Sequence, residues 1–245
     1  MKIVVIGNDN DDFINKILET YPNFQSETRE SADIQPHLPV DPCVTHQGKI
    51  SDHRVLFVNA GALDDDASEI EKDSRLLIDS LFKRIVGGLH WFFLVIRVGT
   101  DADDMVRLLH TFKRVFGEDA MRYTMIVFSN SIRISRYGKD LSSYVSDLPD
   151  NVQKLMRSID KDFFWAFDKL DSAEAFNVGI TRLTQDVDAR AQKRRNKRCF
   201  KMEMMPSPTG SDDASLIDTR ARRGRSTFYY IAVPFQRARG RCTIA

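Results

Sequence analysis

The sequence has few cysteines and no long hydrophobic segment. It contains 245 residues but only three cysteines, Cys43, Cys199 and Cys242, whose spacing fits neither a metal site nor a disulfide-rich scaffold. No stretch approaches the roughly 20 consecutive apolar residues of a membrane-spanning helix, and the first apolar run is too short for a signal peptide. We therefore expect reduced thiols and a cytoplasmic protein without a membrane span.

The sequence also lacks an excess of charge of either sign, because it contains 36 Lys and Arg residues and 35 Asp and Glu residues. The two parts of the chain, however, differ strongly in net charge. Residues 189–245 carry 14 basic and 4 acidic residues, a net charge of +10, whereas residues 1–188 carry 22 and 31, a net charge of −9. We predict an acidic globular domain over residues 1–188 and a basic, largely disordered tail over residues 189–245.

Short apolar runs alternate with helical patterns along the predicted domain. Runs typical of strands buried on both faces occupy residues 3–6, 55–58, 91–98, 123–128 and 163–167. Helical spacing of apolar residues occurs at residues 13–20, 67–86, 101–116, 148–158 and 173–187. Residues 21–48 hold four of the eight prolines and predict an irregular connection. The alternation predicts a three-layer α/β fold, with a mostly parallel sheet between helices.

The segment after the first predicted strand is where a phosphate-binding loop would lie, because backbone N–H groups and a helix N-terminus can hold phosphate. Gly7 is in place, but Asp12, Phe13 and Ile14 stand at the second Gly, the Lys and the Ser/Thr of the usual pattern. Neighbouring acidic residues add negative charge where a triphosphate would lie. The candidate loop residues are Gly7, Asn8, Asp9, Asn10, Asp12, Phe13 and Ile14.

Two long segments resemble the immunity-associated GTPases, which have the GIMAP or avirulence-induced-gene type of G domain. Residues 88–98 read Gly-Leu-His-Trp-Phe-Phe-Leu-Val-Ile-Arg-Val, similar to the family's Gly-Pro-His-Ala-Phe-Leu-Leu-Val. Residues 116–129 read Phe-Gly-Glu-Asp-Ala-Met-Arg-Tyr-Thr-Met-Ile-Val-Phe-Ser, similar to Phe-Gly-Glu-Asp-Ala-x-x-Tyr-Thr-x-x-Val-Phe-Thr. The resemblance covers about residues 1–188 and implies a P-loop G-domain fold.

The same resemblance implies a cofactor, partners and a cellular role. Members of this family bind GTP or GDP with Mg²⁺ and assemble with other G domains of their kind, as homo-oligomers or hetero-oligomers, at membranes. A role in the survival of immune cells is implied as well. These properties are expectations for this chain, and each depends on the residues that stand at the family's ligand positions.

Those positions carry unusual residues. Asn59 stands where the family has the Asp that helps to hold Mg²⁺, and Gly61 falls on the Gly of that motif in a shifted alignment. In the base-reading segment, with Ser129 and Asn130, Ile132 occupies the place of an Asp that accepts hydrogen bonds from guanine. An unpaired base edge costs selectivity. Asp168 stands at a usual Asn of the last base-contact loop.

We interpret the chain as a G domain with a degenerate nucleotide site, without catalytic residues, that acts by assembly at a membrane surface. Hydrolysis of GTP is not expected, although the fold resembles a GTPase. The alternative is an active GTP-binding protein with unusual ligands, such as backbone N–H groups of residues 8–12 in place of the lysine.

The predicted tail combines basic clusters with a terminal cysteine motif. Clusters lie at residues 193–198, 220–225 and 237–241, and Cys242-Thr-Ile-Ala resembles a C-a-a-X box for prenylation. A lipid and basic clusters together would hold the chain on an anionic cytoplasmic membrane face. A solvated tail with an incidental cysteine is the alternative. Nucleic-acid binding through the basic residues ranks third, because the domain itself is acidic.

Overall fold

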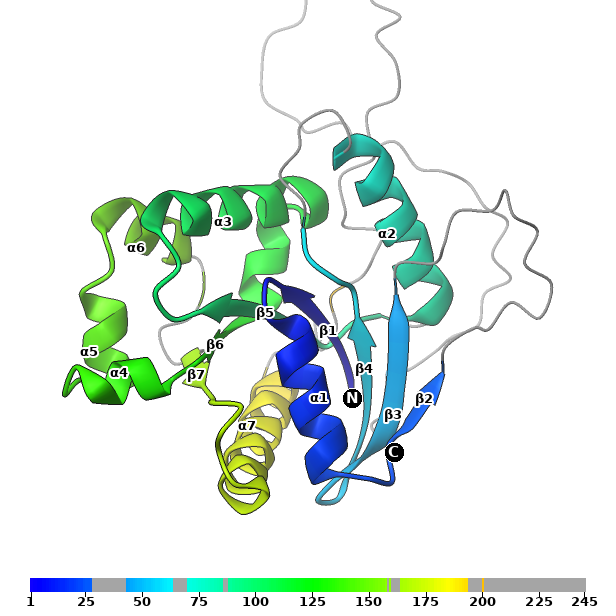
Figure 1. Ribbon diagram of the computed structural model, residues 1–245. Helices are drawn as coiled ribbons and strands as arrows, with labels where there is room; N and C mark the ends of the chain where they lie inside the picture. Colours follow the sequence, from blue (N-terminus) through cyan, green and yellow to red (C-terminus); the bar gives the residue numbers. More distant parts are fainter. Residues whose placement is uncertain are drawn as a thin grey trace, which may run out of the picture.

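The computed structural model describes residues 1–27, 43–63, 70–85, 88–157, 159, 164–193 and 200. Its seven-stranded sheet has the order β2-β3-β4-β1-β5-β6-β7 (Figure 1). The strands are β1 (Lys2–Gly7), β2 (Gln25–Glu27), β3 (Val44–Ile50), β4 (His53–Asn59), β5 (Trp91–Arg97), β6 (Thr124–Ser129) and β7 (Phe164–Ala166). The helices are α1 (Asn10–Thr20), α2 (Ile70–Arg84), α3 (Ala102–Phe116), the 3₁₀ helix η1 (Glu118–Tyr123), α4 (Ile132–Arg136), α5 (Leu141–Ser146), α6 (Asp150–Met156) and α7 (Ala173–Lys193).

The sheet is mostly parallel. Strands β4, β1, β5, β6 and β7 pair in parallel, whereas β2 and β3 add an antiparallel edge. All five predicted strands and five predicted helices occur, with shifted ends. The prediction of a mostly parallel α/β fold is therefore confirmed.

Aromatic side chains on β5 define the two faces of the sheet. Successive side chains of a strand point to opposite faces. The ring of Phe93 lies 5.9 Å from that of Phe13 on α1, whereas the ring of Phe92 lies 5.2 Å from Phe112 and 4.8 Å from Phe116 on α3. Helix α1 therefore covers one face and α3 the other, and the sheet is buried between them.

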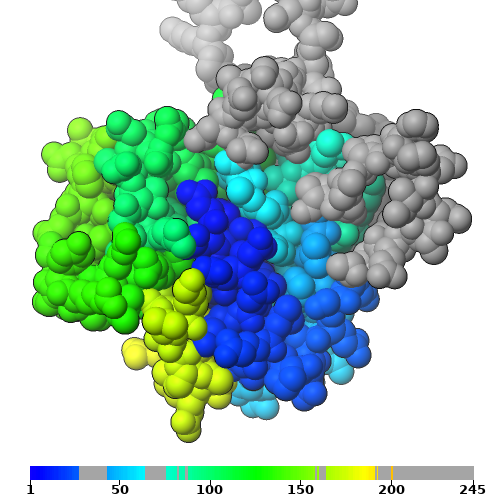
Figure 2. Space-filling model, in the orientation of Figure 1, coloured from blue at the N-terminus to red at the C-terminus, as the bar shows by residue number. Residues whose placement is uncertain are grey.

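Helices α1 and α7 share one face of the sheet. Helix α1 buries Phe13, Ile14 and Ile17 at helical spacing, and Phe176 of α7 packs 6.2 Å from Phe13. In the space-filling view, α1 (blue) runs down the middle of the visible face beside the start of α7 (yellow-green) (Figure 2). Helix α1 begins directly after the loop that follows β1.

The prediction of an irregular connection over residues 21–48 was wrong for β2 and for most of β3. Strand β3 buries Thr45 and His46, and the Ser26 hydroxyl of β2 lies 2.9 Å from His46 Nδ1. Polar side chains at these buried positions are satisfied by hydrogen bonds, so no apolar pattern marks the strand. Residues 28–42 lie outside the described part.

Part of the predicted tail packs on the domain. Helix α7 continues to Lys193, and Phe200, which is fully buried, exchanges backbone hydrogen bonds with Leu89 at N···O distances of 2.6 and 3.0 Å. The Phe200 ring lies 5.4 Å from Phe92 and 5.5 Å from Tyr123. The domain boundary at residue 188 stays a prediction, and residues 201–245 lie outside the described residues.

Within the described part of the chain, no helix has the length and apolar character needed to cross a bilayer.

Candidate functional site

The predicted ligand positions converge on the carboxyl edge of the sheet. Strands β1, β4, β5 and β6 end there at Gly7, Asn59, Arg97 and Ser129. The chain leaves β1 toward the β4 side of the sheet, whereas β5 and β6 follow on the other side. In open α/β sheets, ligands bind outside the strand ends at such a reversal. The tertiary structure thus brings together residues that are up to about 160 positions apart in the sequence.

The loop between β1 and α1 is short and tightly packed. Only Asn8 and Asp9 separate Gly7, the last residue of β1, from the first residue of α1. Gly7 has a φ of +130°, and a Cβ there would lie 2.1 Å from the Val95 carbonyl oxygen. The Gly7 N–H donates to the Gly61 carbonyl at 3.2 Å, and the Asn8 N–H donates to Val95 at 3.3 Å. Only glycine allows this close approach.

The two positions aligned with the Lys and the Ser/Thr of a phosphate loop point into the core. Phe13 is fully buried and Ile14 is 3% exposed. The Phe13 ring makes edge-on contacts, at centroid distances of 5.5 to 6.2 Å, with five aromatic rings from β4, β5, β7, the following loop and α7. These rings belong to Phe57, Phe93, Trp165, Phe167 and Phe176. Phe13 therefore packs against side chains from both halves of the sheet, which are the strands on the β4 side of β1 and the strands on its β5 side.

The Asp9 carboxylate lies between two strand ends. Arg97 Nε at the end of β5 donates to Asp9 Oδ2 at 3.0 Å, and the Ser129 hydroxyl at the end of β6 donates to the same oxygen. The Asp9 side chain is 12% exposed and the Arg97 side chain 54%. Sequence reasoning missed Arg97. Its signal was a basic residue near the end of an otherwise apolar strand.

Amide pairs hold the first turn of α1 to the end of β4. The Asn59 Oδ1 atom accepts a hydrogen bond from the side-chain amide of Asn10, which is a buried residue. The Asn59 amide donates to Asp11 Oδ1 at 2.8 Å, and the Gly61 N–H approaches Asn59 Oδ1 at 3.4 Å. Both polar ends of the Asn59 amide are therefore engaged by the chain itself.

The two predicted base-contact loops are joined to each other. Asp168, which is 4% exposed, accepts from the backbone N–H groups of Ile132 at 3.1 Å and Leu170 at 2.9 Å. Its own N–H donates to the Asp171 carboxylate at 2.8 Å. Asn130 has a positive φ of 59° in the turn before α4. The Asp168 carboxylate thus holds the turn after β6 to the loop after β7.

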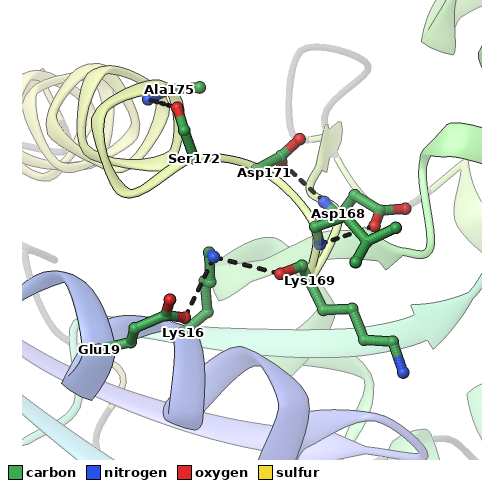
Figure 3. Close-up of polar contacts among 8 residues, drawn as sticks. Lys16, Glu19, Asp168, Lys169, Asp171, Ser172 and Ala175 are labelled. Carbon is green, nitrogen blue, oxygen red and sulfur yellow. Dashed lines mark hydrogen bonds and ion pairs between the residues drawn. The ribbon is translucent and has the colours of Figure 1, made fainter.

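A buried lysine fastens the same loop to α1. Lys16, 5% exposed, donates from Nζ to the Lys169 carbonyl oxygen and to Glu19 Oε2, both at 3.1 Å (Figure 3). The hydroxyl of Ser172 accepts from the Ala175 N–H at 3.1 Å and caps the start of α7. Lys16 was not among the sequence candidates, and its ammonium group holds the loop before α7 in place.

His90 lies at the opposite edge, before β5. Its Nδ1 accepts a hydrogen bond from the Lys2 N–H at 3.0 Å. Burial, together with the positive charges of the chain's first amino group and of Lys2, lowers the His90 pKa from 6.5 to about 4. His90 is therefore a neutral, packed histidine at neutral pH. Among the residues that the structure describes, no group of three or more His, Cys, Asp or Glu side chains is arranged to hold a metal ion.

Comparisons with known proteins agree with this fold. The AIG1 family matches residues 7–212, and no curated protein sequence matches. A structure of a dimerization-deficient mutant of Toc33 from Arabidopsis thaliana is 12% identical, with a TM-score of 0.52, and covers 78% of this chain and 84% of that chain. Toc33 from the same plant in complex with Mg²⁺ and GMPPNP is also 12% identical, with a TM-score of 0.52 and coverage of 81% and 86%.

A third structure concerns the chloroplast translocon components atToc33 and psToc159, for whose GTPase activity dimerization is important. It is 12% identical, has a TM-score of 0.55, and covers 80% of this chain and 84% of that chain. At this identity the solved structures establish the fold, whereas the family match spans well over half of the sequence. The chain therefore belongs to the AIG1 family and carries an AIG1-type GTP-binding domain.

Proposed function

We propose that this AIG1-family protein has a degenerate nucleotide site and acts by assembling with related G domains at a membrane surface. The observation that carries the proposal is the path of the chain after β1. Two residues join β1 to α1, and Phe13, at the position of the phosphate-binding lysine, lies among five aromatic rings. A loop of two residues leaves no concave row of backbone N–H groups around a phosphate chain.

The residues at this edge do not fit a guanine nucleotide with Mg²⁺. Magnesium prefers carboxylate and phosphate oxygens, but Asn59 presents an amide that is already bonded to Asn10 and Asp11. A guanine base needs a carboxylate facing its donor groups, but Asp168 uses both carboxylate oxygens on backbone N–H groups. Binding would break these bonds, so we infer no catalytic step through a nucleotide.

Assembly is the activity that remains for such a domain. Dimerization is important for the GTPase activity of the chloroplast translocon components atToc33 and psToc159, and this chain is similar in fold to that structure. For this chain we propose homo-oligomers, or hetero-oligomers with other AIG1-type domains, that form without nucleotide. The basic clusters of residues 193–241 would attract an anionic membrane face at about 1 kcal/mol for each basic residue near the surface.

Calorimetric titration of the full chain with GTP and GDP in the presence of Mg²⁺ tests the nucleotide part of the proposal. We expect no binding heat, and sedimentation should give the same oligomer distribution with and without nucleotide. ATP with Mg²⁺, and GTP with EDTA, are the matched controls. Micromolar, magnesium-dependent binding of GTP would overturn the proposal in favour of an active GTP-binding protein with unusual ligands.

Membrane association is tested separately in cells. Cys242, which lies outside the described residues, is the predicted lipidation site, and Cys43, which is buried, supplies a matched substitution. Cys242→Ser should shift the protein from the membrane fraction to the supernatant, whereas Cys43→Ser should not. An unchanged distribution of the Cys242→Ser variant would remove the lipid from the proposal.

A further inference from the structure

Two donor groups at the carboxyl edge converge on one carboxylate oxygen, Asp9 Oδ2, at the N-terminus of α1. The Arg97 guanidinium supplies a positive charge at 3.0 Å, and the Ser129 hydroxyl, on a side chain that is 2% exposed, supplies a second donor. Asp9 also stands at the N-cap of α1, where the helix dipole favours a negative charge. The two donors come from the ends of the neighbouring parallel strands β5 and β6, and both bond to a single carboxylate oxygen.

The surroundings leave the Asp9 carboxylate little freedom to move away. The preceding Gly7 is packed against the Val95 carbonyl, and the following Asn10 is bonded to Asn59. The Asp9 side chain is 12% exposed, so most of its charge is shielded from water and is balanced by Arg97. A carboxylate fixed in this way competes with any external anion as an intramolecular group, at a high effective concentration.

We propose that Asp9 is an internal ligand: its carboxylate fills an anion subsite made by Arg97 and Ser129 at the N-terminus of α1. The chain thereby blocks its own site against external phosphate or carboxylate groups. This inference rests on the proposed function, because it identifies what takes the place of an external ligand at the nucleotide edge. Removal of the Asp9 carboxylate should therefore leave Arg97 and Ser129 available to bind an external anion.

The test is chemical rescue of the full-length Asp9→Ala variant by inorganic phosphate, followed by thermal unfolding. We expect Asp9→Ala to lower Tm by about 4 °C, because Arg97 and Ser129 lose their acceptor. Phosphate should restore most of that loss in Asp9→Ala and should leave the parent protein unchanged, relative to chloride at equal ionic strength. Adding Arg97→Gln to Asp9→Ala should abolish the rescue, since the cation that holds the anion is gone.

The matched control is Asp147→Ala, which removes a carboxylate paired with Lys139 at 2.6 Å on the surface. Its Tm should change little and should not respond to phosphate. If Asp9→Ala does not fold, Asp9→Gly tests the same point, because it also removes the carboxylate and empties the subsite, and Gly is tolerated at an N-cap. Rescue that is absent from the Asp9 variants, or equal in the Asp147 control, would overturn the inference.

The outcome is distinguishable from failure of the proposed function. Binding of GTP with Mg²⁺ to the parent protein would refute the degenerate site. Lack of phosphate rescue, with no GTP binding to the parent protein, would refute the internal ligand alone.

Discussion

The two edges of the sheet are closed by different chemistry. At the amino edge, Phe200 pairs with Leu89 and packs its ring against the core, and His90 is neutral. At the carboxyl edge, charged and amide groups bond to each other, as in the pair of Asp9 and Arg97. Apolar burial contributes more free energy than partly exposed polar pairs. The difference teaches that apolar packing in the core and at the amino edge holds the fold, whereas the carboxyl edge is held mainly by polar pairs between strand ends.

The largest effect is expected from the core residue beneath the carboxyl edge. Phe13→Ala should lower the free energy of unfolding by about 4 kcal/mol and Tm by about 10 °C, because it leaves a cavity among five rings. Urea denaturation measures the change, and Phe13→Leu is the milder control, with a loss nearer about 1.5 kcal/mol. A loss below about 1 kcal/mol for Phe13→Ala would show that this ring does not join the two halves of the sheet.

The amino edge should be nearly as sensitive. Phe200→Ala should cost about 3 kcal/mol in urea denaturation, because a buried aromatic ring is removed from Phe92 and Tyr123. The matched control is Leu170→Ala, which trims a side chain that is 74% exposed and should change the free energy by less than about 0.5 kcal/mol. Equal losses for the two variants would contradict the attachment of residue 200 to the domain.

His90 should make the amino edge sensitive to acid. Its pKa is about 4 in the fold and about 6.5 when unfolded, so the unfolded chain binds the proton first as the pH falls. The His90 contribution is complete above about pH 6.5, and it should decrease by about 2 kcal/mol between about pH 7 and pH 5.

His90→Gln should flatten the pH dependence of the unfolding free energy over this range. The control, His110→Gln, changes a histidine exposed on α3 and should retain the dependence of the parent protein. Parallel curves for the parent and His90→Gln would disprove the assignment to His90.

The smallest effect is expected at the carboxyl edge. Asn59→Asp restores the carboxylate of the family motif, but it removes the bond to Asp11 and places two negative charges together. Because Asp11 is exposed, solvent screening limits the loss to about 1 kcal/mol. Thermal unfolding at low and high salt measures it, and added salt should reduce the loss. Stabilisation by Mg²⁺ in this variant would instead show that the edge retains a metal position.

Much of the fold could be predicted because its strands are buried on both faces. Continuous apolar runs mark β5 and β6, whose residues are almost all buried, and helical spacing marks α3. Strand β3 could not be predicted in the same way, since Thr45 and His46 occupy buried positions and are paired by hydrogen bonds. The short helices α4 and α5 were also missed, because five or six residues are too few to show a period.

The candidate site was only partly predictable. The sequence placed Asn59, Ser129 and Asp168 at strand ends, and these residues do lie at the carboxyl edge. The sequence could not show that Arg97 and Ser129 both bond to Asp9, because Asp9 lies 88 residues from Arg97 and 120 residues from Ser129. Nor could it reveal that residue 200 returns to the sheet, since a single Phe beside a basic cluster carries no periodic signal.

The sequence alone determined the layered α/β fold, the family resemblance and the charge difference between residues 1–188 and 189–245. Periodicity, motifs and composition are properties of continuous segments, so they can be recognised without the tertiary structure. Only the tertiary structure decided what happens at the two edges. In the folded protein, Phe13 points into the core, the Asp9 carboxylate bonds to Arg97 and Ser129, and Phe200 pairs with Leu89. These contacts join segments far apart in the chain, and such contacts form only when the sheet brings its strand ends together.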